Sequence, residues 1–367
     1  MNGIGQGTRR PERSRLAWVD AGKGLAISLV AMYHSASWLI GTGFEIEGWR
    51  AVNEALSSLR MPLFFMLAGL FAGKWLTASW SSLWRSKLSL FVWVFLVWEV
   101  IGSVVFLLGT SVQGQAIAIP ATIRELLLSP FAPRFELWFI WALAIFFVVA
   151  KLIRRVDWRV QLVLAGLCSA AALSGWETAN IGWSGSIKYF FFFLVGLYLK
   201  DAVFRLSRTK VGPSLVSLMI AWVGVSAVVA VYGLRWVPGL YFVNCVLGVV
   251  TGVTVSRWLA RIPRLVAIGS NTLPVYLTHT PLIIVMSCAL ALLARVIPFS
   301  PLAPALPPAL AVLAIAGSLA VSAAAMRTPF SVLYAAPRFV SGAPKPVRRH
   351  AMPARRDPPD PSRRSSS

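Results

Sequence analysis

The chain has 367 residues, of which 57% are hydrophobic and only 13% are charged. Such a composition is too apolar for an ordinary soluble domain, and 16 Trp and 21 Phe suit lipid-facing surfaces with interfacial aromatic belts. The net charge of +22 does not require nucleic acid as a partner, because Lys and Arg also collect in cytoplasmic loops and no nucleic-acid module is visible. The sequence therefore predicts an all-α, polytopic bundle of transmembrane helices.

Ten apolar segments have lengths that suit a membrane span. We predict the spans at 16–40, 57–76, 88–109, 136–153, 159–174, 184–201, 213–232, 239–257, 266–295 and 304–326. The ninth is long, and we expect it to be tilted, or broken near Pro274 or Pro281. The spans define a membrane domain of residues 16–326 between a basic cytoplasmic tail, 1–15, and a basic, largely disordered cytoplasmic tail, 327–367.

The distribution of basic residues predicts the orientation of the chain. Most of the 35 Lys and Arg residues fall in the two tails and in alternate loops between the spans. With both termini inside, the outer side holds only seven of them: Arg50, Arg60, Arg124, Arg134, Lys188, Arg235 and Arg295. Because basic residues favour the cytoplasmic side, both termini are predicted to be cytoplasmic.

The first span carries three ionisable residues that lipid does not favour, Asp20, Lys23 and His34. At about 100° per residue, the eleven residues from Lys23 to His34 return to within roughly 20° of the starting direction, so the three side chains share one face. Lys23 and His34 lie about 16 Å apart along the axis. The simpler alternative is a pair that snorkels to the inner interface beside an unrelated His, but His34 is too deep for snorkelling.

The other ionisable residues within or near the spans could each have either a structural or a catalytic role. Glu99, in the third span, needs either a proton or a partner, so a structural pair competes with a catalytic role. His279 could be a histidine that only packs between helices. Arg60, near the outer edge of the second span, could be an interfacial anchor, or a cation that keeps His34 neutral and stabilises an oxyanion.

Four stretches resemble the acyltransferase-3 family of integral membrane acyltransferases, in family order. They are "WVDAGKGLAISLVAMYHS" (18–35), "LRMPLFFMLAGLFAGK" (59–74), "ELWFIWAL" (136–143) and "IGSNTLPVYLTHTPL" (268–282). The first matches the family marker, a basic residue followed by ten residues and then His, with Lys23 where most members have Arg. Within the family, the chain resembles the bacterial fucose-4-O-acetylase-like inner-membrane proteins.

The resemblance implies ten transmembrane helices in a bacterial inner membrane. It implies transfer of an acyl group, usually acetyl, from cytoplasmic acyl-CoA to a hydroxyl of a carbohydrate, a lipid-linked glycan or another envelope acceptor. The histidine of the first helix, here His34, is the family's proposed catalytic group. No permanently bound cofactor and no metal ion is implied, and membrane lipid is the expected surrounding partner.

Acyl transfer to a hydroxyl needs a base, stabilisation of the oxyanion and close alignment of the reactants. We assign the catalytic site to His34, Arg60, Glu99 and His279, and the acyl-CoA contacts to Asp20, Lys23, Arg85 and Lys87. His34 could act as the base or accept the acyl group itself. The rival function is a proton-coupled small-molecule transporter, which also uses intramembrane His, Glu and Lys. No inverted repeat with broken helices is visible to support it.

Overall fold

The computed structural model describes residues 10–115, 117–297 and 300–342. Within these residues the chain is all-helical, without a strand, as the composition predicts. The longer helices are α1 (Arg10–Gly41), α2 (Gly48–Gly69), α5 (Ser89–Val112), α7 (Trp138–Leu152), α8 (Trp158–Leu173), α9 (Ile181–Tyr198), α11 (Pro213–Tyr232), α12 (Leu240–Leu259), α14 (Thr272–Ala294) and α15 (Leu306–Ala325).

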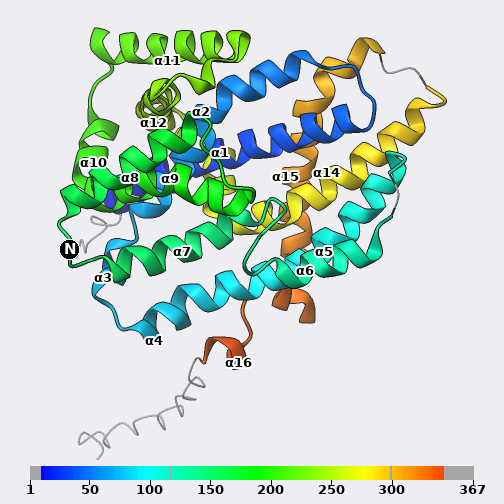
Figure 1. The fold of residues 1–367 in the computed structure, drawn as a ribbon, viewed down its shortest axis with the longest axis horizontal. Helices are drawn as coiled ribbons and strands as arrows, with labels where there is room; N and C mark the ends of the chain where they lie inside the picture. The colour runs from blue at the N-terminus through cyan, green and yellow to red at the C-terminus, as the bar shows by residue number, and fades with distance from the viewer. Residues whose placement is uncertain (1–9, 116, 298–299, 343–367) are drawn as a thin grey trace, which may run out of the picture.

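Shorter helical segments connect the long ones. They are α3 (Gly73–Thr77), α4 (Trp80–Leu83), the π-helix η1 (Trp84–Leu88), α6 (Ile119–Leu128), α10 (Lys200–Arg208), the 3₁₀ turn η2 (Leu234–Trp236), α13 (Pro263–Ser270), η3 (Ser300–Ala305), η4 (Pro329–Leu333) and α16 (Arg338–Ser341). Figure 1 shows α3, α4 and α10 at one end of the bundle, whereas the α1–α2 connection lies at the opposite end.

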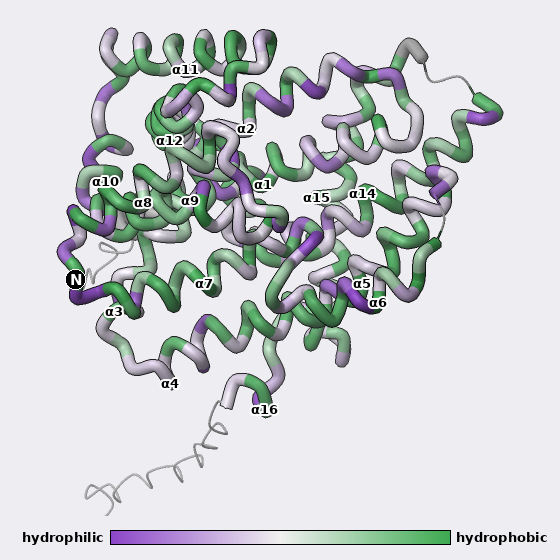
Figure 2. Tube along the Cα trace, in the orientation of Figure 1, coloured by the Kyte–Doolittle hydropathy of each residue, from purple (hydrophilic) through white to green (hydrophobic). Residues whose placement is uncertain are grey.

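Each predicted span has a helical counterpart, and seven helical segments of the described chain are long and apolar enough to cross a membrane. Helices α7 and α8 are apolar but shorter, and α2 is not among the seven. The first half of α2 is polar because several of its side chains line the cavity described below. Figure 2 shows hydrophobic residues along α7 and α12. The multi-pass helical fold is confirmed, while the count of ten and the side of each terminus stay predictions.

Helix α1 packs against α2, α12, α13, α14 and α15, so it lies within the bundle. Two glycines of the "DAGKG" stretch make the N-terminal half of α1 thin enough for this packing. A Cβ atom at Gly24 would collide with the carbonyl oxygen of Leu265 in α13, and one at Gly22 would press on Ser256 of α12. Small residues allow helices in a membrane to approach closely, so these glycines have a packing role.

An aromatic core joins α2, α7 and α9. Phe65 of α2 is fully buried and packs on Phe139 and Phe146 of α7, with ring centroids 4.5 and 5.0 Å apart. Phe146 also contacts Phe193 of α9 at 5.5 Å. Since burial of each aromatic ring stabilises the packed state, this core holds together three of the helices that surround the candidate site.

The expected break in the ninth span lies earlier than either proline. The helix is interrupted at Asn271, between α13 and α14, where the backbone leaves the helical region with φ −118° and ψ 37°. The Asn271 amide donates to the Ala267 carbonyl at 2.9 Å. Pro274 lies in the first turn of α14, where a missing N–H costs little, and Pro281 is accommodated inside α14. The predicted break near Pro274 is therefore present, three residues before this proline, whereas the helix continues through Pro281.

The segment directly after α15, the first part of the tail predicted at 327–367, packs on the bundle. Three indole N–H groups of Trp84, Trp93 and Trp98 donate to the carbonyls of Val340, Val332 and Leu333, respectively, at 3.1, 2.7 and 2.7 Å. The buried Tyr334 hydroxyl lies 2.8 Å from Thr278 Oγ1 of α14. These polar anchors order the segment as far as Gly342, and the rest of the predicted tail lies outside the described residues.

Candidate active site

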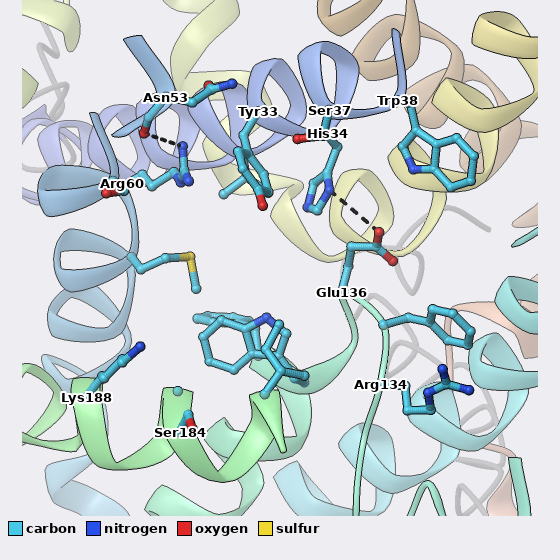
Figure 3. Close-up of a pocket in the computed structure, with 18 of the residues that line it drawn as sticks. Tyr33, His34, Ser37, Trp38, Asn53, Arg60, Arg134, Glu136, Ser184 and Lys188 are labelled. Carbon is cyan, nitrogen blue, oxygen red and sulfur yellow. Dashed lines mark hydrogen bonds and ion pairs between the residues drawn. The ribbon is translucent and has the colours of Figure 1, made fainter. Parts of the chain in front are cut away.

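A cavity of about 1200 Å³ lies between the predicted outer parts of α1, α2, α7 and α9 (Figure 3). Its wall includes residues between 30 and 41 of α1, residues between 50 and 64 of α2, and Phe106 and Thr110 near the end of α5. Residues 134–136, which lead into α7, and residues 177–179, which lead into α9, complete the wall. A cavity of this size is large enough for a ligand of several hundred daltons.

His34 projects from α1 into this cavity and faces the carboxylate of Glu136 (Figure 3). The distance from His34 Nδ1 to Glu136 Oε1 is 3.5 Å, and both side chains are largely buried. Glu136 is held by α14, because the Tyr276 hydroxyl donates to its backbone carbonyl and accepts the Ile140 N–H at 3.4 Å. An imidazole whose Nδ1 is oriented by a carboxylate keeps Nε2 available for proton transfer.

His279 of α14 lies behind His34, with ring centroids 5.4 Å apart. It is fully buried, and its Nδ1 lies 2.9 and 2.8 Å from the carbonyl oxygens of Val275 and Tyr276. Because carbonyl oxygens only accept, Nδ1 carries the proton and Nε2 accepts from the Thr280 hydroxyl at 3.2 Å. His279 is absent from the cavity wall, so it supports the His34 ring by packing.

Arg60 of α2 occupies the cavity wall on the other side of Tyr33 from His34 (Figure 3). Its guanidinium stacks over the Tyr33 ring at 4.2 Å, and the Tyr33 ring lies 4.9 Å from the His34 ring. Arg60 is only 8% exposed and donates one hydrogen bond, from Nη1 to the Asn53 carbonyl at 3.4 Å. The row of Arg60, Tyr33 and His34 therefore presents a cation and an imidazole to the same space.

Four further cations line the cavity, and each has a carboxylate partner. Ion pairs join Arg50 to Glu47, Arg134 to Glu125, Lys188 to Glu177 and Arg235 to Glu54. Glu47 lies outside the membrane-spanning helices, and the hydrogen bond from Arg50 lowers the pKa of its carboxyl group. The cavity wall is thus strongly polar, but most of its charge is internally compensated.

Glu99 is not brought to this site. It is 1% exposed on α5 and borders a separate void of about 10 Å³ with Ser103, Thr122 and Arg134. Both of its carboxylate oxygens are buried and make no hydrogen bond of good geometry among the described residues, although the backbone N–H of Arg134 is near enough to act on them. Since a carboxylate must reach the reacting atoms to transfer a proton directly, this placement does not support the catalytic assignment of Glu99.

The predicted donor residues lie at the other end of α1. Lys23 pairs with Asp20 at 3.6 Å, and its ammonium group lies 5.4 Å from the centre of the Phe71 ring. Lys87, on η1, is close enough to Lys23 and Lys74 for their charges to act on it. Arg85 is exposed on the same short helix. Lys23, Lys87 and Lys74, the last not predicted from the sequence, form a basic cluster that is separate from the cavity.

Glu136 is the functional candidate that the sequence reasoning missed. It is the first residue of the "ELWFIWAL" stretch, directly before an apolar helix, and this carboxylate at a span edge was the available signal. Tyr33 was missed as well, because an aromatic residue next to His34 does not stand out in an apolar helix. Within the described residues, no group of three or more His, Cys, Asp and Glu side chains is arranged to hold a metal ion.

Comparison with known proteins indicates which reaction this site serves. A family model described as an acyltransferase domain, of the acyltransferase-3 type, matches residues 16–327, which include every helix from α1 to α15 except the first residues of α1. Neither a curated protein nor a solved structure matches the chain.

Proposed function

Because the chain belongs to the acyltransferase-3 family and is therefore a membrane acyltransferase, we propose that it transfers an acyl group, expected to be acetyl, from acyl-CoA to a hydroxyl in the cavity beside His34. The proposed acceptor is a carbohydrate, free or lipid-linked, or another molecule of the cell envelope. The proposed location is a bacterial inner membrane, with the cavity on the outer side. Membership of the fucose-4-O-acetylase-like subgroup stays a prediction.

The observation that carries this proposal is the pairing of His34 with Glu136 at the wall of a large cavity. With Nδ1–H directed to the carboxylate, Nε2 takes the proton of the acceptor hydroxyl as its oxygen attacks the thioester carbonyl. Collapse of the tetrahedral intermediate breaks the C–S bond, and the thiolate receives the proton from the imidazolium. The products are an ester and free CoA. In the second route, Nε2 attacks the thioester carbonyl first, the C–S bond breaks, and CoA leaves as the thiolate while the acyl group stays on His34. The acceptor hydroxyl then attacks the acyl carbon, the C–N bond to Nε2 breaks, and the hydroxyl proton neutralises the thiolate.

The donor is proposed to approach from the basic cluster of Lys23, Lys74 and Lys87, since CoA carries several phosphates. No permanently bound cofactor is proposed. On the acceptor side, the cavity wall contains the rings of Trp138, Phe139 and Tyr189. The Trp138 and Tyr189 rings are nearly parallel, with centroids 6.1 Å apart. Such rings offer apolar faces on which a sugar ring can pack, while nearby polar groups bind its hydroxyls.

Incubation of the purified protein with radiolabelled acetyl-CoA and an envelope glycan fraction tests the proposal. We expect label in the glycan for the wild type and for Cys168→Ser, a control on the exposed part of α8, but not for His34→Ala. Label that remains on the wild-type protein and can be transferred to glycan on later addition indicates the acyl-carrier route. Proton-driven solute transport in proteoliposomes without any acylation would support the transporter instead.

A further inference from the structure

Among the residues that the structure describes, Arg60 differs from the other cations of the cavity in having no carboxylate partner. The described residues place no Asp or Glu oxygen within ion-pair distance of its guanidinium, whereas Arg50, Arg134, Lys188 and Arg235 each have one. Of the five N–H donors of Arg60, only one makes a hydrogen bond, to Asn53. The stacking on Tyr33 satisfies one face of the guanidinium but none of its in-plane donors.

A buried cation with unused N–H donors is unfavourable unless a partner accepts those hydrogen bonds and balances the charge. The residue type indicates what that partner is, because the planar fork of Arg suits two oxygens of a carboxylate or a phosphate. The site is accessible to such a group, since Arg60 lines the large cavity and Figure 3 shows its side chain extending toward Tyr33 and the cavity space. The opposite wall supplies Lys188 and Ser184, which also face this space.

We propose that the acyl acceptor is anionic, and that Arg60 binds its carboxylate or phosphate while His34 acts on a hydroxyl of the same molecule. This inference rests on the proposed function in taking the cavity as the acceptor site. Tyr33 contacts both residues, so the anion and the reacting hydroxyl lie on opposite sides of one aromatic ring. An acidic sugar, whose carboxylate or phosphate is separated from its ring hydroxyls by a few bonds, fits that arrangement.

An alternative role for Arg60 is stabilisation of the oxyanion formed from the thioester. The two roles differ in what they predict for neutral acceptors. An oxyanion donor acts on every acceptor equally, because the thioester carbonyl is common to all of them. An anion-binding Arg60 affects only acceptors that carry the negative group, and it affects their binding even when no acyl donor is present.

The test therefore measures binding without acyl-CoA. Full-length protein in detergent is titrated with methyl glucuronide, glucose 6-phosphate and methyl glucoside, and the dissociation constants are obtained from ligand-dependent thermal unfolding. We expect the wild type to prefer at least one anionic sugar to the neutral glucoside. A preference for the glucuronide indicates a uronic acid acceptor, and a preference for the sugar phosphate indicates a phosphorylated one.

In Arg60→Gln the affinity for the preferred anionic sugar is expected to fall roughly ten- to hundredfold, with the glucoside unaffected. Arg60→Lys keeps the positive charge but lacks the planar guanidinium, so its affinity for the preferred anionic sugar is expected to fall several-fold. This variant serves as the test if Arg60→Gln does not fold. Arg124→Gln removes an exposed outer charge on α6, away from the cavity wall, and is expected to keep the full preference.

Equal wild-type affinity for all three sugars, or a preference that survives in both Arg60 variants, overturns the inference. A parallel assay of acyl transfer from labelled acetyl-CoA separates this result from a failure of the proposed function. Transfer to neutral acceptors with no anion preference rejects only the anionic acceptor. An intact, Arg60-dependent anion preference without any acyl transfer keeps the anion site and rejects the transferase mechanism.

Discussion

His34 on α1 and Glu136 at the entry to α7 face each other across 3.5 Å in the cavity wall. The contact joins the two stretches of the chain that separately resemble the first-helix marker and the Leu-Trp-Phe element of the family. A base oriented by a carboxylate is a recurring arrangement for taking a proton from a hydroxyl. The pair also gives Glu136, a residue without an obvious role in the sequence, a specific and testable function.

Replacement of His34 by Ala is expected to lower acyl transfer by at least about 10²-fold, because the general base or acyl carrier is removed. Membrane insertion and yield should stay near those of the wild type. The His34 ring lines the cavity, and its removal leaves the aromatic core of α2, α7 and α9 intact. Radiolabel transfer and the amount of membrane-extracted protein provide the two readouts. Wild-type activity in this variant would remove His34 from the mechanism.

Glu136→Gln is expected to lower kcat, by less than His34→Ala does, and to leave the KM for acyl-CoA unchanged. The amide keeps the shape of the side chain but loses the negative charge that stabilises the imidazolium. Glu125→Gln is the matched control, because Glu125 pairs with Arg134 at a distance from His34. If both variants lose kcat equally, the effect comes from the stability of the outer loops and not from orientation of His34.

Lys23 is expected to act by charge on the donor side. Lys23→Arg should retain substantial activity, and Lys23→Gln should raise the KM for acyl-CoA, because uniform binding of an anionic substrate is lost. The measurement is the initial rate over a range of acyl-CoA concentrations. An unchanged KM in a stable Lys23→Gln protein would rule out the donor contact.

The ion pair between Lys23 and Asp20 supplies the control for that experiment. If Lys23 only balances Asp20, Lys23→Gln should lower the protein yield, and the Asp20→Asn, Lys23→Gln double mutant should restore both yield and kinetics. A donor contact instead leaves the raised KM in place in the double mutant.

Both termini are expected on the cytoplasmic side. An alkaline phosphatase fused after residue 340 should be inactive, whereas the same enzyme fused after Gly114, between α5 and α6, should be active. The expectation follows from the concentration of Lys and Arg in the tails and alternate loops. Strong activity of the first fusion would contradict the ten-span topology.

The crossing of α2 and α9 is expected to tolerate no side chain at Gly196. A Cβ atom there would collide with the backbone carbonyl of Met66, and the backbone cannot give way as a side chain can. Gly196→Val should lower stability by about 1–3 kcal/mol or more, measured by thermal unfolding in detergent. Gly224→Val on α11, where the added atoms meet open space, is the control and should have little effect.

The sequence by itself determined the helical membrane fold, the approximate positions of the helices and the shared face of Lys23 and His34. The second span is the largest displacement, because α2 begins at Gly48 and not at residue 57. These features are local: apolar length specifies a candidate span, and the 100° turn per residue specifies which side chains align along one helix. The sequence from residue 18 to residue 35 was therefore enough to predict which of its side chains align. The predicted pairing of Asp20 with Lys23 is present in the structure.

Only the tertiary structure decided which residues meet across helices. It placed Glu136 beside His34 and kept Glu99 off the wall of the large cavity. Among the described residues it gave Arg60 no carboxylate partner, while each of four neighbouring cations has one. It also packed the segment around Tyr334 against α5 and α14. The physical reason is that such contacts depend on the rotation of each helix and on the path of its loops, which close packing of rings and glycines specifies for the whole bundle at once.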